Sequence, residues 1–188
     1  METWPDSAFT PFRCAKGSTW EGGVRVPGLM MWQGTIEPGQ QSDGIFDFND
    51  IMPTALGLAG ETARMPTDRY IDGVDQTSFL LSGGHSNRKF HHYWLQETFS
   101  ALRCGEYKFV LNATSDDDTG SAGPGGFTGT LERYAYAKLY NLWLDPKEQH
   151  NYMTRKLAYV DVFQHGIRSH LKTFKQFPPK KVLGQKSP

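Results

Sequence analysis

The sequence predicts an α/β fold in which several short strands, joined by frequent turns, are followed by one long helix. Turns are expected throughout because 20 glycines and 11 prolines are spread over 188 residues. A strand that is half buried is indicated by large side chains that alternate along the chain, at Tyr107, Phe109 and Leu111. The helix is indicated by apolar residues that recur every three or four positions, at Leu157, Val160, Phe163, Ile167, Leu171 and Phe174.

The N-terminal part of the chain predicts a loop and then a strand. Residues 1–23 are rich in Pro, Gly, Ser and Thr, as loops are. The apolar run Val24–Trp32 is too short for a typical helix and predicts a buried strand. Pro27 and Gly28 lie within it and indicate a bulge or a late start of the strand.

One short helix is predicted in the first third of the chain. Asn49 or Asp50 is expected to cap it, and Pro53 falls in the first turn, where a missing N–H costs least. The helix is expected to run through Ala59, with Gly60 ending it. Its apolar side predicts packing in the core and no chemistry.

The second half of the chain predicts four strands. We expect them at His91–Leu95, Phe99–Arg103, Glu106–Leu111 and Tyr136–Leu144. The segment Ala113–Thr130 is rich in glycine and acidic residues and is expected to be a surface loop.

Composition excludes several functional classes. The 20 basic residues equal the 20 acidic residues, so we expect neither a nucleic-acid nor an anionic-membrane partner. There is no stretch of 18 apolar residues, so no membrane span is expected. The residues at the N-terminus do not have the pattern of a signal peptide. Two cysteines, Cys14 and Cys104, do not make a disulfide framework and are expected to be reduced thiols.

Several segments, in one order, resemble sulfatases of the arylsulfatase type. The most specific runs from Thr10 to Pro27 and contains Lys16, then Trp20-Glu21-Gly22-Gly23, then Arg25-Val26-Pro27. The others are Asn49–Gly60, Asp72-Gly73-Val74-Asp75 with Phe79-Leu80-Leu81, Leu139–Leu142 with Asp145-Pro146, Glu148 and Asn151, and Phe174–Pro179. The chain is therefore similar to the C-terminal portion of that family.

The resemblance implies a fold and a division into domains. Sulfatases resemble alkaline phosphatase, with a large, mostly parallel sheet followed by a small antiparallel sheet and a helix. Residues 1–97 would be the C-terminal part of the large α/β domain, and residues 98–188 the small α+β subdomain. The strands at Val24–Trp32 and His91–Leu95 would then expose apolar faces and an unpaired edge. The expected partner is the missing N-terminal sulfatase part, or a second copy of the chain.

The resemblance also implies a chemistry that this chain carries only in part. Sulfatases cleave sulfate esters with a formylglycine beside a calcium ion. Lys16 matches the family's lysine that contacts a sulfate oxygen, and an ammonium can stabilise negative charge there. Gly22 and Gly23 would permit unusual backbone angles and a close approach beside it. Trp20, Glu21 and Arg25 are expected to be structural.

The remaining catalytic groups of the family are not found in the sequence. The nucleophile motif, Cys or Ser followed by x-Pro-Ser-Arg, does not occur, and the calcium ligands and catalytic histidines of the family would lie upstream. His91 and His92 do not replace them, since neighbours on a strand point to opposite faces. Ala15 stands where many relatives have an acidic residue, which changes the surroundings of Lys16. We expect no activity from this chain alone.

Two other functions remain open at this point. The chain could be a non-catalytic module that binds a protein or glycan through Trp143, Tyr152 and Tyr159. It could also be part of a phosphatase or phosphodiesterase of the same superfamily, although the residues around Lys16 favour a sulfatase. The resemblance implies a periplasmic or extracellular location for the parent enzyme.

Overall fold

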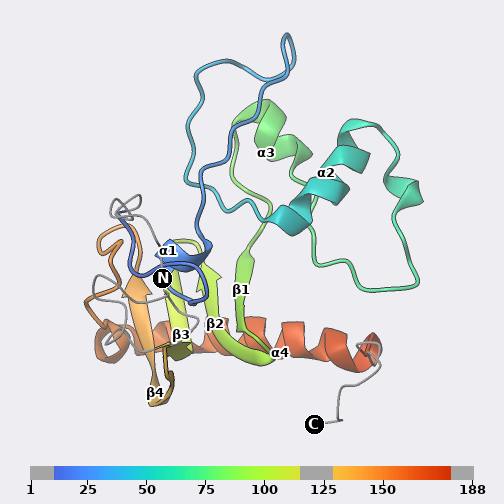
Figure 1. Ribbon diagram of the computed structural model, residues 1–188. Coiled ribbons are helices and arrows are strands. Elements are labelled where there is room, and N and C mark those ends of the chain that lie inside the picture. The colour runs from blue at the N-terminus through green and yellow to red at the C-terminus, as the bar shows by residue number, and fades with distance from the viewer. Residues whose placement is uncertain (1–10, 115–128, 179–188) are drawn as a thin grey trace.

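The structure is a computed structural model that describes residues 11–114 and 129–178 (Figure 1). Its helices are α1 (Glu21–Val24), α2 (Ile51–Leu58), α3 (Thr77–Ser82) and α4 (Val160–Gln176). Its strands are β1 (Phe90–Leu95), β2 (Thr98–Cys104), β3 (Tyr107–Thr114) and β4 (Leu131–Asn141). The predicted α/β fold class, with a small antiparallel sheet and one long helix, is confirmed. Most of the loop predicted at 113–130 lies outside the described residues.

The four strands form one antiparallel sheet in the order β1-β2-β3-β4. Two tight turns reverse the chain between the first three strands. Each turn contains one residue in the left-handed region, Gln96 at φ 53° and Gly105 at φ 57°. The strand β4 ends where the Asn141 side chain accepts the backbone N–H groups of Trp143 and Leu144. This side chain explains why the strand stops short of the predicted end.

Both faces of the sheet are covered, because consecutive side chains of a strand point to opposite sides. The helix α4 packs on one face, where the Phe163 ring stacks on the Phe109 ring with centroids 5.1 Å apart. The residues of this core are Leu102, Phe109, Leu139 and Phe163. The segment around α1 packs on the other face. The residues of that second core are Trp20, Tyr93, Ala101, Val110, Ala113, Tyr140 and Leu142. The sheet is therefore the middle of three layers, with α4 on one face and the α1 segment on the other (Figure 1).

The prediction of a strand at Val24–Trp32 is wrong for this chain. Residues 25–32 form no strand, and Leu29 and Met31 are 97% and 94% exposed. A strand requires a neighbour with which to exchange backbone hydrogen bonds, and no described strand runs alongside this segment. The apolar pattern is therefore present without the sheet that it would join.

The strand at His91–Leu95 exists, but its expected place in a large parallel sheet is wrong. As β1 it pairs antiparallel with β2, and Phe90 lies opposite Cys104. The tight turn at Gln96 causes this arrangement, because it reverses the chain and places β2 antiparallel beside β1. The predicted domain boundary at residue 97 lies in that turn, and the division into two domains stays a prediction.

The short helices α2 and α3 lie beyond the N-terminal end of β1 (Figure 1). Asp47 caps the turn that precedes α2, since its side chain accepts the Asn49 N–H while Asp50 accepts the Asp47 N–H. The helix α2 ends at Leu58, one residue before the predicted end at Ala59, and Gly60 follows at φ 69°. Among the described residues, no helix has the length and apolar character needed to cross a membrane.

Candidate functional site

The segment that carries Lys16 is a tight loop, here called the lysine loop (residues 13–21). Lys16 is exposed at its tip. Left-handed backbone angles turn the loop at Cys14 (φ 61°) and Gly17 (φ 91°). Within the loop, the Ser18 hydroxyl donates to the Ala15 carbonyl oxygen at 2.8 Å. The loop therefore holds the backbone on both sides of Lys16 in a defined shape.

Gly22 and Gly23 close the loop by lying against its backbone. The Gly22 N–H donates to the Arg13 carbonyl oxygen at 2.9 Å. A Cβ on Gly22 would lie 2.2 Å from the Cys14 carbonyl oxygen, and one on Gly23 would lie 2.7 Å from that of Ala15. Neither glycine has a left-handed φ. The expected close approach is present, whereas the unusual angles occur at other residues of the loop.

Trp20 fixes the lysine loop to the sheet. Its side chain is buried, and Nε1 donates to the Thr114 carbonyl oxygen at 3.2 Å. The Tyr140 ring meets it edge-on at 5.8 Å, and the Arg13 guanidinium lies 3.6 Å above the indole. The loop is thereby clamped between β3 and β4.

A cluster of buried charges lies under the loop. Both Lys108 and Glu21 are buried, and Lys108 Nζ lies 3.1 Å from Glu21 Oε1 and 2.8 Å from Glu148 Oε1. The Tyr93 hydroxyl donates to Glu21 at 2.6 Å, and Arg103 lies 3.2 Å from its other oxygen. Two carboxylates therefore face two cations, so the cluster is neutral as a whole.

The same charges hold the backbone of the loop. Lys108 Nζ donates to the Thr19 carbonyl oxygen at 2.6 Å. The Glu21 N–H donates to Glu148 Oε2 at 2.8 Å. The position of the lysine loop therefore depends on side chains of β3 and of the segment after β4.

The pKa values of the two carboxyl groups in the cluster are shifted in opposite directions. Burial acts to raise the pKa of Glu21, but Lys108, the Tyr93 hydrogen bond and Arg103 outweigh it, so the pKa is lowered. Burial and the negative charge of Glu21 raise the pKa of Glu148. The positive charge of Lys108 acts to lower it but is outweighed, so the pKa is raised. Glu21 therefore carries the more firmly held negative charge.

Arg25 lies apart from the buried cluster. Its guanidinium donates to Asp43 at 2.9 Å, and Asp43 is exposed. The guanidinium also lies 4.4 Å from the centre of the Phe12 ring. These contacts join the start of the 25–32 segment to the loop before α2.

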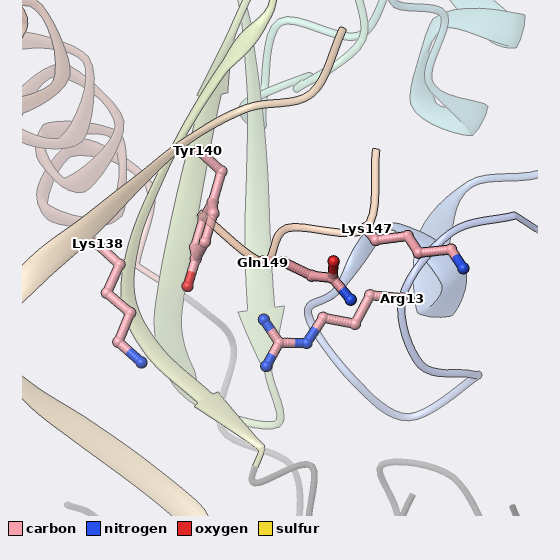
Figure 2. A pocket seen from close by; sticks show the side chains of 5 residues that line it. All are labelled: Arg13, Lys138, Tyr140, Lys147 and Gln149. Atoms are coloured by element: carbon pink, nitrogen blue, oxygen red, sulfur yellow. The ribbon is translucent and has the colours of Figure 1, made fainter. Parts of the chain in front are cut away.

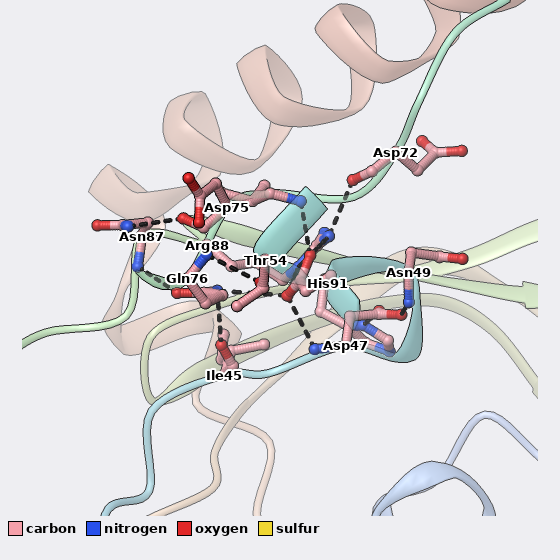
Figure 3. Close-up of polar contacts among 12 residues, drawn as sticks. Ile45, Asp47, Asn49, Thr54, Asp72, Asp75, Gln76, Asn87, Arg88 and His91 are labelled. Atoms are coloured by element: carbon pink, nitrogen blue, oxygen red, sulfur yellow. Dashed lines mark hydrogen bonds and ion pairs between the residues drawn. The ribbon is translucent and has the colours of Figure 1, made fainter. Parts of the chain in front are cut away.

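A second buried ion pair joins segments that are distant in the sequence (Figure 3). Asp50 is fully buried, and Arg88 Nε donates to its two oxygens at 3.1 and 2.9 Å. Asp50 also accepts the Val74 N–H at 2.7 Å, and Thr54 accepts the Gln76 N–H at 3.0 Å. The start of α2 and the segment 72–76 are therefore joined as one unit, which was not predictable from the sequence.

The histidines of β1 point to opposite faces, as predicted. The His91 Nδ1 lies 2.6 Å from Asp47 Oδ2, and this hydrogen bond lowers the pKa of Asp47 to about 2. His92 instead stacks on His170 of α4, with ring centroids 3.8 Å apart. Burial and the neighbouring His170 lower the pKa of His92 to about 3. In the described ranges, 11–114 and 129–178, no three His, Cys, Asp or Glu side chains lie together as a metal site would require.

Sequence reasoning missed Lys108, and it named Glu148 only as part of the resemblance to sulfatases, without a role. Lys108 alternates with Tyr107, Phe109 and Leu111 in a strand predicted to be half buried, but it is fully buried because the α1 segment covers its face of the sheet. Glu148 has φ 52°, an angle unusual for a residue that is not glycine, and sequence alone does not reveal it. Cys14 and Cys104 are both free thiols.

Comparison with known families gives two matches that lie in order along the chain. The family model described as Sulfatase matches residues 6–61, which include the lysine loop. The model for the sulfatase AslA C-terminal domain matches residues 100–175, which include β3, β4 and all but the last residue of α4.

Individual proteins agree with the family matches. An arylsulfatase of Hemicentrotus pulcherrimus is 38% identical over 126 residues, which are 65% of this chain and 22% of that protein. An N-acetylgalactosamine-6-sulfatase of Canis lupus familiaris is 32% identical over 177 residues, 87% of this chain and 33% of that protein. The crystal structure of the PsFucS1 sulfatase from Pseudoalteromonas sp. matches 96% of this chain and 36% of its own, with 35% identity and a TM-score of 0.87. The chain thus spans about a third or less of the length of the two relatives.

Proposed function

The chain belongs to the sulfatase family and matches its C-terminal portion, and on that premise we propose that it is one part of a sulfuric ester hydrolase. The observation that carries the proposal is the match of the Sulfatase model to the segment that contains Lys16. The buried cluster under that segment supports it, because a loop so firmly held can present one ammonium group in a fixed position.

In this proposal Lys16 binds an oxygen of the substrate sulfate. Its side chain is exposed, so a substrate can reach it. An ammonium beside the sulfate stabilises the negative charge that develops as the ester bond breaks. Glu21, Lys108 and Glu148 do not touch the substrate; they position the loop.

The other catalytic groups would come from residues outside this sequence. The formylglycine motif does not occur in the 188 residues. The described residues do not fit a calcium ion either, because they offer no cluster of ligands. Calcium in the family supplies a positive charge beside the sulfate, and here it would need carboxylates from elsewhere. We therefore propose that this chain alone has no sulfatase activity.

The substrate class and the partner follow from the same premise. The relatives named arylsulfatase and N-acetylgalactosamine-6-sulfatase support a sulfate ester as the substrate. The exposed apolar segment 25–32 is the surface on which we expect the N-terminal sulfatase part to dock, with a second copy of this chain as the other candidate. By family resemblance the parent enzyme is periplasmic or extracellular.

Hydrolysis of a chromogenic aryl sulfate by the purified chain, with calcium added, tests the proposed lack of activity. We expect no release of phenol above the buffer blank, from either the chain or its Lys16→Ala variant. Release by the chain that disappears in Lys16→Ala would show that a nucleophile lies within these 188 residues, and the proposal would then be wrong.

A further inference from the structure

A hollow of about 520 Å³, here called the Arg13 hollow, opens beside the lysine loop (Figure 2). Its lining residues are Arg13, Lys138, Tyr140, Lys147 and Gln149. Every one of these side chains carries a hydrogen-bond donor, three are cations at neutral pH, and none is a carboxylate. This lining suits an anionic ligand.

Arg13 is held in place at the hollow before any ligand arrives. Its Nη1 donates to the Glu148 carbonyl oxygen at 2.6 Å, and its guanidinium lies over the buried Trp20 ring, 3.6 Å from the ring centre. An ordered side chain loses less conformational entropy when it binds. Guanidinium groups also match the geometry of sulfate and carboxylate oxygens.

The carboxylate nearest in the sequence does not neutralise the hollow. Glu148 stands between Lys147 and Gln149, but its side chain points inward, where it pairs with Lys108 at 2.8 Å. Tyr140 contributes a hydroxyl donor that is protonated at neutral pH, and burial raises its pKa further. Among the residues that the structure describes, the lining of the hollow therefore has three cations and no carboxylate, although the whole chain has a net charge of zero.

We propose that the Arg13 hollow binds a second anionic group, a sulfate or carboxylate, of a sugar substrate whose scissile sulfate lies at Lys16. This inference rests on the proposed function. Arg13 and Lys16 are three residues apart, so their Cα atoms lie within about 11 Å of each other. One anionic oligosaccharide can therefore contact both. A sugar substrate is supported by the relative named N-acetylgalactosamine-6-sulfatase.

Calorimetric titration of the chain with a chondroitin sulfate hexasaccharide at low salt tests the proposal. The site variant is Lys138→Gln with Lys147→Gln, and the matched control is Lys172→Gln with Lys175→Gln on the exposed side of α4. We expect Kd to rise roughly tenfold in the site variant and less than about twofold in the control. Replacing Lys138 and Lys147 by arginine is expected to keep the affinity.

Several outcomes would overturn the proposal. If Kd for the hexasaccharide rises equally in the site variant and in the control variant, binding depends on net charge alone and not on the hollow. No binding by the unmodified chain, or binding of inorganic sulfate as tight as that of the hexasaccharide, would also overturn it. The melting temperature of each variant shows whether it is folded, and the arginine pair keeps the test decisive if the glutamine pair unfolds. Lys16→Ala separates the two proposals, because hexasaccharide binding through the hollow should persist in that variant whatever the role of Lys16 in catalysis.

Discussion

Replacing Lys108 with methionine is expected to lower the free energy of unfolding by about 3–5 kcal/mol. The ammonium is fully buried, and it is the cation shared by Glu21 and Glu148. Methionine has a similar length but no charge, so it would leave Glu148 without a cation and Glu21 with Arg103 alone. Urea unfolding followed by tryptophan fluorescence measures the effect, because Trp20 lies in the same core.

Two further variants make this result specific to the buried cluster. Lys172→Met, on the exposed side of α4, is expected to change the free energy of unfolding by less than about 0.5 kcal/mol. Adding Glu148→Gln to Lys108→Met should recover part of the loss, because a buried negative charge then disappears with the positive one. A loss below about 1 kcal/mol in Lys108→Met would contradict the account of how the lysine loop is held.

Arg88→Met is also expected to lower the free energy of unfolding by about 3–5 kcal/mol. Arg88 pairs with the buried Asp50 and also donates to the carbonyl oxygens of Asp72 and Phe90, at 2.8 and 3.2 Å. Burial acts to raise the pKa of Asp50, but the Arg88 hydrogen bond, two backbone donors and the Gln76 side chain outweigh it and lower the pKa. Without Arg88 the carboxylate would remain buried with no cation.

The pH dependence of this variant gives a second test. In the unmodified chain Asp50 contributes stability that is lost as the pH falls through its lowered pKa. In Arg88→Met the pKa should rise above the ordinary value, so protonation relieves the buried charge. The difference in unfolding free energy between the unmodified chain and Arg88→Met should therefore be smaller at pH 4 than at pH 7. Arg69→Met is the matched control, since the Arg69–Asp68 pair is exposed, and a loss equal to that of Arg88→Met would contradict the account.

Elements that depend on neighbouring residues were predictable from the sequence. The period of apolar residues predicted α4, and the turn at Gly105 separates β2 from β3 near the predicted place. Gly60 follows the end of α2 as expected, because a glycine readily adopts the left-handed φ that terminates a helix. The residues of the lysine loop could be named for the same reason, since they form one continuous segment.

Features that depend on distant residues could not be predicted. Val24–Trp32 has the pattern of a strand, but pairing is decided by whether another strand lies beside it. Lys108 alternates with apolar residues, as an exposed residue of a strand would, but Thr19 of the lysine loop, 89 residues earlier, covers it. Asp50 reads as a helix cap, whereas its pairing with Arg88 depends on the path of the chain across 38 residues.

A chimera with the PsFucS1 sulfatase tests most directly whether this chain supplies the sulfate-binding lysine of a sulfatase. In this protein the present chain replaces the 36% of PsFucS1 that it matches, and the rest of PsFucS1 is expected to supply the other residues of the site. We predict that the chimera hydrolyses an aryl sulfate, that Lys16→Ala lowers kcat/KM roughly 100-fold, and that Lys175→Ala leaves it unchanged. A folded chimera without activity, or an active one in which Lys16→Ala has no effect on kcat/KM, would contradict the account.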